Sequence, residues 1–267
     1  MQQVSLPGLS KKHGIGEIQR AFEKAKSLGA TNRDKVPNYY SYSALKAFAQ
    51  GHEKGHPYSL LEYYFQERET KINNSFVVGN IVEAGICGGI QNLEKLYYLY
   101  KGRISKKIRI EAEVQKKQPV TENTFFKCIN IIKQAEKSSF LKDILNSKGL
   151  TTQEKVTGQE KVTGIKLKGF LDLRLDSHII DIKTTSMISD FEDLIYYRFR
   201  YWIQAAVYHI VTDCDKFTFF VISTQKPYFF KCFTFKKHEL QKLKIRLITE
   251  VLIPLLQCLE KGFEIEF

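Results

Sequence analysis

The stretch GIKLKGFLDLRLDSHIIDIKT, residues 164–184, decides the fold of this chain. Apolar and polar residues alternate along two segments, Gly164–Leu175 and His178–Thr184, as they do in strands with one buried face. Asp176 and Ser177, which separate the two segments, are residue types that favour turns. The pattern predicts two adjacent strands joined by a tight turn.

The second of these strands carries Asp181 and Lys183, two positions apart. Side chains at positions i and i+2 of a strand leave the same face, so both point to one side while Ile180 and Ile182 point into the core. Asp172 ends or follows the first strand and can bring its carboxylate beside Asp181. An Asp-x-Lys pair alone is common and is usually a surface ion pair. Here it stands in an apolar strand and follows a Gly-x-x-Asp, which makes the combination more specific.

These residue types point to a metal site. Two close carboxylates repel each other and usually need a cation between them. Hard oxygen ligands with positions left open for water and phosphate suit Mg²⁺ or Mn²⁺. A lysine beside such a metal can orient or help deprotonate an attacking water and stabilise charge on the phosphoryl group. Asp172, Asp181 and Lys183 therefore predict a site for metal and phosphate.

The chain is strongly basic. Its 267 residues include 41 Lys and Arg against 29 Asp and Glu, which gives a net charge of +12 and a pI near 9.3. Such a charge favours a polyanionic partner, because each phosphate contact releases condensed counterions. The alternative is that the excess lysine only aids solubility. Hydrophobic residues at 43% and charged residues at 26% are ordinary for a globular protein and argue against disorder.

Five cysteines stand at wide, irregular spacing without a Cys-x-x-Cys pair. The spacing argues against a zinc knuckle or an iron–sulfur cluster and predicts buried, reduced thiols. The N-terminal residues lack the apolar run of a signal peptide, and no stretch reaches 18 apolar residues. We therefore expect a cytoplasmic protein that does not enter a membrane.

Outside the strand pair, most of the chain is expected to be helical. Residues 1–38 are polar and basic and predict an arm that is partly mobile or lies across DNA, whereas 39–267 predict one α/β domain with a helical N-terminal portion. Ser41 or Ser43 is expected to cap a helix that runs to about Ala49, and Pro254 to kink the last helix. We expect further helices over 16–28, 60–68, 76–90, 124–145, 191–212 and 238–259, and further strands over 216–223 and 228–235.

A direct repeat precedes the strand pair. The sequence Gln-Glu-Lys-Val-Thr-Gly occurs at residues 153–158 and again at 159–164. Six residues are too short for a solenoid unit. The repeat is therefore either a duplicated strand segment or an extended loop that leads into the sheet.

The motifs resemble a known family. Gly-Phe-Leu-Asp at 169–172 and Ile-Ile-Asp-Ile-Lys-Thr-Thr at 179–185 resemble the signature of the PD-(D/E)XK nucleases in their RecB-like branch. That branch has a further helical Gln-x-x-x-Tyr, which Gln204 and Tyr208 match. Positions i and i+4 share one helical face, although on its own such a pair would usually be a half-buried helix face. The aromatic and arginine-rich stretch 196–204 makes the resemblance closest to RecE-type exonucleases (exonuclease VIII) and phage exonucleases.

A weaker part of the resemblance lies upstream. The segment Val78–Glu83 is similar to a Gly-x-x-x-His helix of the family, with Glu83 where the family's additional metal ligand stands. Carboxylate is a good Mg²⁺ ligand. The alternative is that Glu83 is a solvated helix residue.

The resemblance implies a restriction-endonuclease-like core, with a mixed central β-sheet flanked by helices. It implies a Mg²⁺-dependent deoxyribonuclease, with Mn²⁺ as a substitute, whose metal is held by Glu83, Asp172, Asp181 and the carbonyl of Ile182. Lys183 would position or activate water, while Gln204 and Tyr208 would position Lys183, the metal-bound waters or the scissile phosphate. Arg198 and Arg200 either contact DNA or stay solvated beside aromatic rings that enter the core.

The RecE-type resemblance further implies 5′-to-3′ resection of double-stranded DNA with free ends, in recombination or repair. It also implies a ring-shaped homo-oligomer and a single-strand annealing protein as partner, in a bacterial or phage-infected cell. Two alternatives remain open: a structure-specific or nonspecific endonuclease with the same site, and a non-catalytic DNA-binding protein of nuclease fold. An RNA substrate is a weaker alternative.

Overall fold

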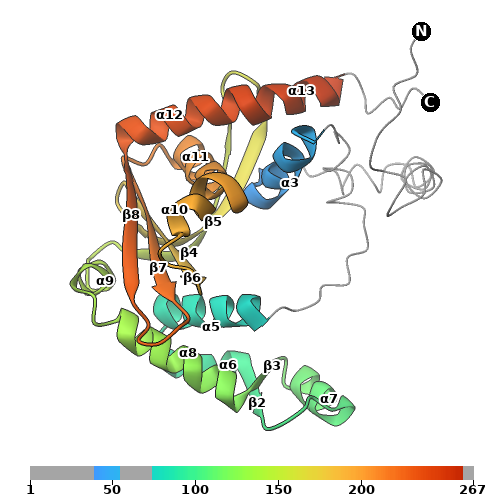
Figure 1. Ribbon diagram of the computed structural model, residues 1–267, viewed down its shortest axis with the longest axis vertical. Coiled ribbons are helices and arrows are strands. Elements are labelled where there is room, and N and C mark those ends of the chain that lie inside the picture. Colours follow the sequence, from blue (N-terminus) through green and yellow to red (C-terminus); the bar gives the residue numbers. More distant parts are fainter. Residues whose placement is uncertain (1–38, 55–73, 261–267) are drawn as a thin grey trace, which may run out of the picture. The chain divides into compact units, whose positions relative to one another are not determined.

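A computed structural model describes residues 39–54 and 74–260 of the chain (Figure 1). The predicted basic arm and the helices expected over 16–28 and 60–68 lie outside these residues. The described residues form two compact units. One contains 39–54, 157–168 and 245–260, and the larger one contains 74–156 and 169–244. Within the described part of the chain, no helix combines the length and the apolar character needed to cross a membrane.

The larger unit is built on a mixed sheet with the strand order β5-β6-β7-β8. The predicted strand pair forms an antiparallel ladder, β7 lies parallel to β6, and β8 returns antiparallel to β7. A further strand, β4, pairs with β5. The bounds are β4 Thr151–Gln159, β5 Lys166–Leu175, β6 His178–Thr185, β7 Lys216–Ser223 and β8 Phe230–Lys236.

Strand β7 lies in the interior of this sheet because its sequence is almost continuously apolar. Every residue from Phe217 to Ser223 is buried, which is typical of a strand that is covered on both faces. Phe219 and Phe220 are neighbours along the strand and therefore point to opposite faces. The contacts of Phe220 and Phe219 therefore show which helices pack on each face of the sheet.

One face of the sheet is covered by three helices, α5 (Asn74–Gly88), α8 (Glu122–Ala135) and α9 (Ser139–Leu145). Their apolar residues share one buried core with Phe220. Ser138 interrupts the helix that we expected over 124–145, because its hydroxyl accepts from the Leu141 N–H at 3.3 Å and starts α9.

The opposite face is covered by α10 (Phe191–Asp193) and α11 (Tyr201–Thr212). Phe219 lies against Phe191 at 6.0 Å between ring centroids and against Tyr201 at 5.6 Å. A π-helical segment, Leu194–Arg198, separates the two helices, and Arg200 has a left-handed φ of 52°. The helix expected over 191–212 is therefore broken into parts. A mixed sheet with helices on both faces confirms the predicted α/β class.

A small parallel pair of strands, β2 (Tyr97–Tyr100) and β3 (Gln118–Thr121), was not predicted. It lies in the region expected to be largely helical, which also contains η2 (Ile90–Asn92), α6 (Leu93–Leu96) and α7 (Lys106–Val114). Each strand has only four residues, which is too few for a period of two to stand out from its helical neighbours.

The second unit contains β1 (Tyr40–Ser41) and α3 (Tyr42–His52), together with a π-helical segment, Ile248–Leu252, and α13 (Ile253–Glu260). Ser41 caps α3 by accepting from the Ala44 N–H at 3.4 Å, as one of the two predicted alternatives. The C-terminal helix expected over 238–259 is α12 (Lys237–Leu247), the π-helical segment and α13. Pro254 lies just after the π-helical segment. Proline has no N–H to donate to a carbonyl of the preceding turn, so the regular helical hydrogen-bond pattern is interrupted at this point.

The two copies of the repeat have different structures. The first copy, residues 153–158, lies in β4. The second copy begins with the last residue of β4 and continues as a turn, in which the buried Glu160 carboxylate accepts from the N–H groups of Val162 and Thr163 at 3.0 and 2.7 Å. The first copy is thus a strand segment, and most of the second is the turn that leads into β5.

Candidate active site

The centre of the site is the ion pair between Lys183 and Asp181 on strand β6. Asp181 is 1% exposed, and the side chains of the two residues meet on one face of the strand, as the spacing predicted. The Lys183 ammonium also lies 5.2 Å from the centroid of the Tyr201 ring and 5.9 Å from that of Phe219. These rings limit the directions in which the lysine can point, so its charge is directed at the carboxylate.

Asp172 enters the site from the neighbouring strand β5. The ladder between β5 and β6 pairs Leu173 with Ile180, and Asp172 directly precedes Leu173 on β5. Its Oδ2 atom accepts from the Ile182 N–H at 2.7 Å. In an extended strand the N–H and C=O of one residue leave on the same side, so the Ile182 carbonyl also faces the side on which Asp172 lies.

Burial makes both carboxylates costly to ionise. It raises the pKa of Asp172 well above its ordinary value, and the charge of Asp181 raises it further, while Lys183 opposes both effects. Burial likewise raises the pKa of Asp181. Burial alone would lower the pKa of Lys183, but Asp181 and Asp172 outweigh it and raise that pKa. The lysine is therefore held as an ammonium between two carboxylates that repel each other.

Helix α11 supplies Gln204 and Tyr208, which fix the position of Asp181. The Gln204 amide donates to Asp181 Oδ1 at 2.6 Å and lies 3.1 Å from the Tyr208 hydroxyl. That hydroxyl donates to the Phe170 carbonyl at 2.5 Å, and burial raises the pKa of Tyr208, which keeps it protonated. The hydrogen bonds of this pair run to Asp181 and to the Phe170 carbonyl of β5. Their contact with Lys183, which was among the predicted alternatives, is indirect and passes through Asp181.

Gly169 leaves room for the Tyr208 ring. A Cβ atom at Gly169 would lie 2.3 Å from Tyr208 Cε1 and 2.9 Å from Cδ1. We expect Gly169→Ala to displace the ring, lower the free energy of unfolding by about 1–3 kcal/mol and weaken the hold on Asp181. Gly88→Ala is the matched control, since nothing lies within 4 Å of a Cβ there. Chemical denaturation of both variants tests this, and equal midpoints would contradict it.

Glu83 lies on α5, is half-buried and is close enough for its charge to raise the pKa of both Asp172 and Asp181. Its Oε1 atom accepts from the Gln153 amide of β4 at 2.9 Å. Among the described residues, no three His, Cys, Asp or Glu side chains converge closely enough to form a ready metal cluster. Glu83 is therefore beside the two aspartates rather than part of a complete three-carboxylate site.

Sequence reasoning missed Cys87, which stands one helical turn after Glu83 on α5. Its Sγ atom donates to the backbone carbonyl of Asp172 at 3.5 Å. Burial and the charge of Asp172 raise the pKa of the thiol to about 12, so it stays protonated. The available signal was the i+4 spacing from Glu83, which places both side chains on one helical face.

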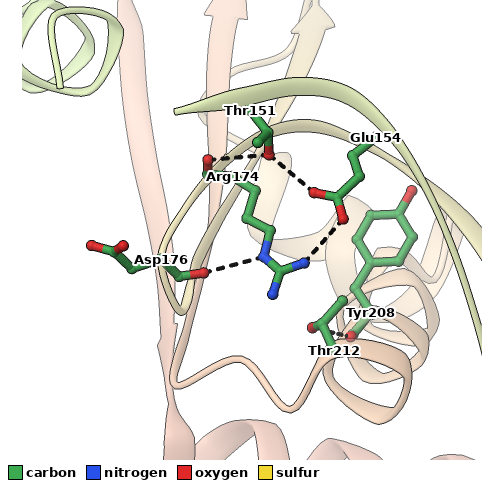
Figure 2. Close-up of polar contacts among 6 residues, drawn as sticks. All are labelled: Thr151, Glu154, Arg174, Asp176, Tyr208 and Thr212. Carbon is green, nitrogen blue, oxygen red and sulfur yellow. Dashed lines mark hydrogen bonds and ion pairs between the residues drawn. The ribbon is translucent and has the colours of Figure 1, made fainter. Parts of the chain in front are cut away.

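Strand β4 is bound to β5 by a network around Arg174 (Figure 2). The Arg174 guanidinium lies 3.1 Å from Glu154 Oε1 and donates to the Asp176 carbonyl at 3.2 Å. The Thr151 hydroxyl donates to Glu154 Oε2 at 3.0 Å and reaches the Arg174 carbonyl at 3.5 Å. These contacts hold β4 on both sides of Gln153 in the sequence.

Arg198 and Arg200, the predicted DNA contacts, precede α11. Arg198 is exposed in the π-helical segment, with its guanidinium 5.5 Å from the centroid of the Phe199 ring. Arg200 is the residue directly before Tyr201, whose ring contacts Lys183. The structure thus places the arginines next to the site in sequence, and their contact with DNA stays a prediction.

The donor set fits a divalent cation. Among the described residues, Glu83, Asp172 and Asp181 offer three carboxylates against the single ammonium of Lys183, and a divalent ion would neutralise the excess. Asp181 Oδ2 and Gln204 Oε1 are both buried without a hydrogen-bond partner in the described part of the chain, although the first forms the ion pair with Lys183. Such oxygens suit a metal ion and its bound water. Asp172, Asp181 and the Ile182 carbonyl would hold the ion, with Glu83 as a further ligand.

Comparison with known proteins identifies a family and solved structures of similar fold. A family model described as "PDDEXK-like domain of unknown function (DUF3799)" matches residues 41–264. A crystal structure of a candidate exonuclease from Eubacterium rectale has 18% identity and a TM-score of 0.60 over 90% of this chain and 87% of that one. A phage-related exonuclease from Haemophilus somnus 129PT has 14% identity and a TM-score of 0.33, over 64% of this chain and 94% of that one. No functionally curated protein matches the chain.

Proposed function

Because this chain belongs to the family of PDDEXK-like domains to which that model corresponds, we propose that it is a divalent-metal-dependent nuclease that hydrolyses DNA. The observation that carries the proposal is the ion pair between Lys183 and Asp181, with Asp172 on the adjoining strand. The Gln204 amide donates to the other oxygen of Asp181. A protein that only binds DNA has no use for buried carboxylates at its phosphate site, since they repel the substrate.

Asp172, Asp181, the Ile182 carbonyl and Glu83 would hold Mg²⁺, and Mn²⁺ would substitute for it. When bound, the ion would supply stabilisation of negative charge on the phosphoryl oxygens and a more acidic water. Lys183 is held protonated, so its ammonium orients the attacking water and stabilises charge on the phosphate rather than removing a proton. Gln204 keeps Asp181 in one orientation, and Tyr208 keeps Gln204 in place.

We propose double-stranded DNA with free ends as the substrate. The net charge of +12 favours a nucleic acid, and the exposed Arg198 suits contact with phosphate. The motif resemblance to RecE-type enzymes supports a 5′-to-3′ exonuclease of recombination or repair in the cytoplasm of a bacterial or phage-infected cell. The same resemblance supports a ring-shaped homo-oligomer that works with a single-strand annealing protein.

The proposal is tested by presenting one plasmid in two forms, closed circular and linearised, to the purified protein with Mg²⁺. We expect the linear form to be degraded to nucleotides and the closed circle to be spared, with no hydrolysis of either form in EDTA. Products are followed on gels and by release of acid-soluble label. Nicking of the closed circle would identify an endonuclease. An RNA of similar length is tested in parallel, and binding without hydrolysis of either plasmid form or of the RNA would contradict the nuclease proposal.

A further inference from the structure

Glu83 is held by a residue outside every motif that the sequence analysis identified as catalytic. The Gln153 amide donates to Glu83 Oε1 at 2.9 Å, over a separation of 70 residues along the chain. Gln153 comes from β4, which pairs with β5, the strand of Asp172. A side chain from the sheet therefore reaches α5 at the residue expected to complete the metal site.

The backbone at Gln153 has a conformation that few residues of its type adopt. Its φ is +55°, in the left-handed region, which costs roughly 1–2 kcal/mol for a residue with a Cβ. The contacts of Thr151 and Glu154 with Arg174 hold β4 on either side of it (Figure 2). Strained backbone conformations cluster at functional sites, where the surrounding contacts hold them in place. Gln153 fits this description, because its neighbours in β4 are held by Arg174 and its side chain donates a hydrogen bond to a candidate metal ligand.

The Gln153 amide also lies next to the second α5 residue that faces the site. The Cys87 thiol donates to the Asp172 carbonyl, and Gln153 is near enough to oppose the rise in the pKa of that thiol. Glu83 and Cys87 are one helical turn apart, so Gln153 meets α5 on the face that contacts β5. This arrangement limits the rotation of the Glu83 carboxylate about its long side chain.

We propose that Gln153 is a positioning residue for the metal site: it engages one oxygen of Glu83 so that the other is directed to the cation held by Asp172 and Asp181. The inference rests on the proposed function for the presence of that cation. A glutamate side chain loses considerable rotamer freedom when it is fixed. Because Gln153 restricts the Glu83 side chain before the metal binds, less conformational entropy is lost on binding and the affinity for the ion rises. Outer hydrogen-bond partners of metal ligands commonly have this effect.

The repeat supplies a matched control. Gln159 is the first residue of the second copy, as Gln153 is of the first, but its amide donates to the Gly164 carbonyl at 2.9 Å and closes the turn. We expect Gln153→Ala to weaken Mn²⁺ binding by about 10- to 100-fold, and Gln159→Ala to leave it unchanged. Isothermal titration of the full-length protein with MnCl₂, without DNA, measures this.

Two further measurements separate positioning from general damage. The double variant Gln153→Ala/Glu83→Ala should bind Mn²⁺ as weakly as Glu83→Ala alone. Once Glu83 is absent, Gln153 has no ligand to position, so its loss has no further effect. The DNA hydrolysis rate of Gln153→Ala should recover toward the wild-type rate at saturating Mn²⁺, since its defect lies in affinity for the ion. Additive losses, or an affinity equal to the wild type, would overturn the inference.

The inference and the proposed function fail in different ways. If the wild type binds Mn²⁺ with an affinity that depends on Glu83 and on Gln153 but hydrolyses no nucleic acid, the proposed function is wrong and the positioning role stands. If it hydrolyses DNA while Gln153→Ala binds Mn²⁺ normally, only the positioning role is wrong. Absence of Mn²⁺ binding by the wild type would overturn both.

Discussion

Lys183→Ala is expected to abolish DNA hydrolysis while leaving DNA binding intact. Among the described residues, Lys183 alone pairs an ammonium with the buried Asp181, and its position beside both aspartates suits the orientation of water and the stabilisation of phosphoryl charge. Removing such a group costs about 10²–10⁴-fold in rate, so we expect a fall of roughly 10³-fold. Single-turnover release of label from a linear duplex at saturating Mg²⁺ measures it.

Two variants guard this test against a folding defect. Lys183→Gln keeps a hydrogen-bond donor for Asp181 without the charge, and we expect it to lose activity to a similar degree while retaining the wild-type melting temperature more closely. Lys216→Ala removes an exposed lysine from the adjoining strand β7 and should leave the rate unchanged. Wild-type rates in both Lys183 variants would rule out the assigned role.

Asp172→Asn is expected to inactivate the protein and, without metal, to stabilise it. In the folded chain the pKa of Asp172 lies well above its ordinary value of 3.8, because burial and Asp181 disfavour the carboxylate. At pH values above the ordinary pKa and below the raised pKa, Asp172 keeps its proton in the folded state and has released it in the unfolded state. The free energy of unfolding therefore falls as the pH rises through this range. Asparagine does not ionise, yet its carbonyl can still accept from the Ile182 N–H.

Thermal melts at pH 4 and pH 8, with EDTA or with MgCl₂, check this prediction. In EDTA the variant should melt above the wild type at pH 8, by about 2–4 °C for each kcal/mol gained, and the difference should shrink at pH 4. Mg²⁺ should raise the melting temperature of the wild type and not that of the variant. Asp176→Asn, in the exposed turn of the same hairpin, should behave as the wild type. An unchanged Mg²⁺ response in Asp172→Asn would exclude this aspartate as a ligand.

The sequence predicted those parts of the site that depend on short-range geometry. Asp181 and Lys183 meet because strand side chains alternate, and a tight turn brings β5 and Asp172 alongside. Gln204 and Tyr208 were identified through the motif of the family that the chain resembles, and their spacing of one helical turn places both on one helical face. Gln153 and Cys87 escaped because they meet their partners over 70 and 85 residues of chain, where only tertiary packing decides what is near.

The fold was predicted to a similar limit. Strands with many apolar residues, such as β7, were recognised from composition and period. The interruptions at Ser138 and Arg200 were missed, since a hydroxyl that caps a helix and a left-handed residue within a helical pattern leave little trace in periodicity. The glycine at position 169 formed part of the motif, but its steric reason became apparent only when the Tyr208 ring was placed against it.

The hexapeptide repeat has a consequence for how this protein can vary. Side chains of a strand alternate with a period of two, and six is even, so gain or loss of one whole copy preserves which side chains of β4 face inward. The first copy lies in the strand and most of the second forms the turn that leads into β5, so gain or loss of a whole copy would change the length of this segment without reversing the alternation of side chains along β4.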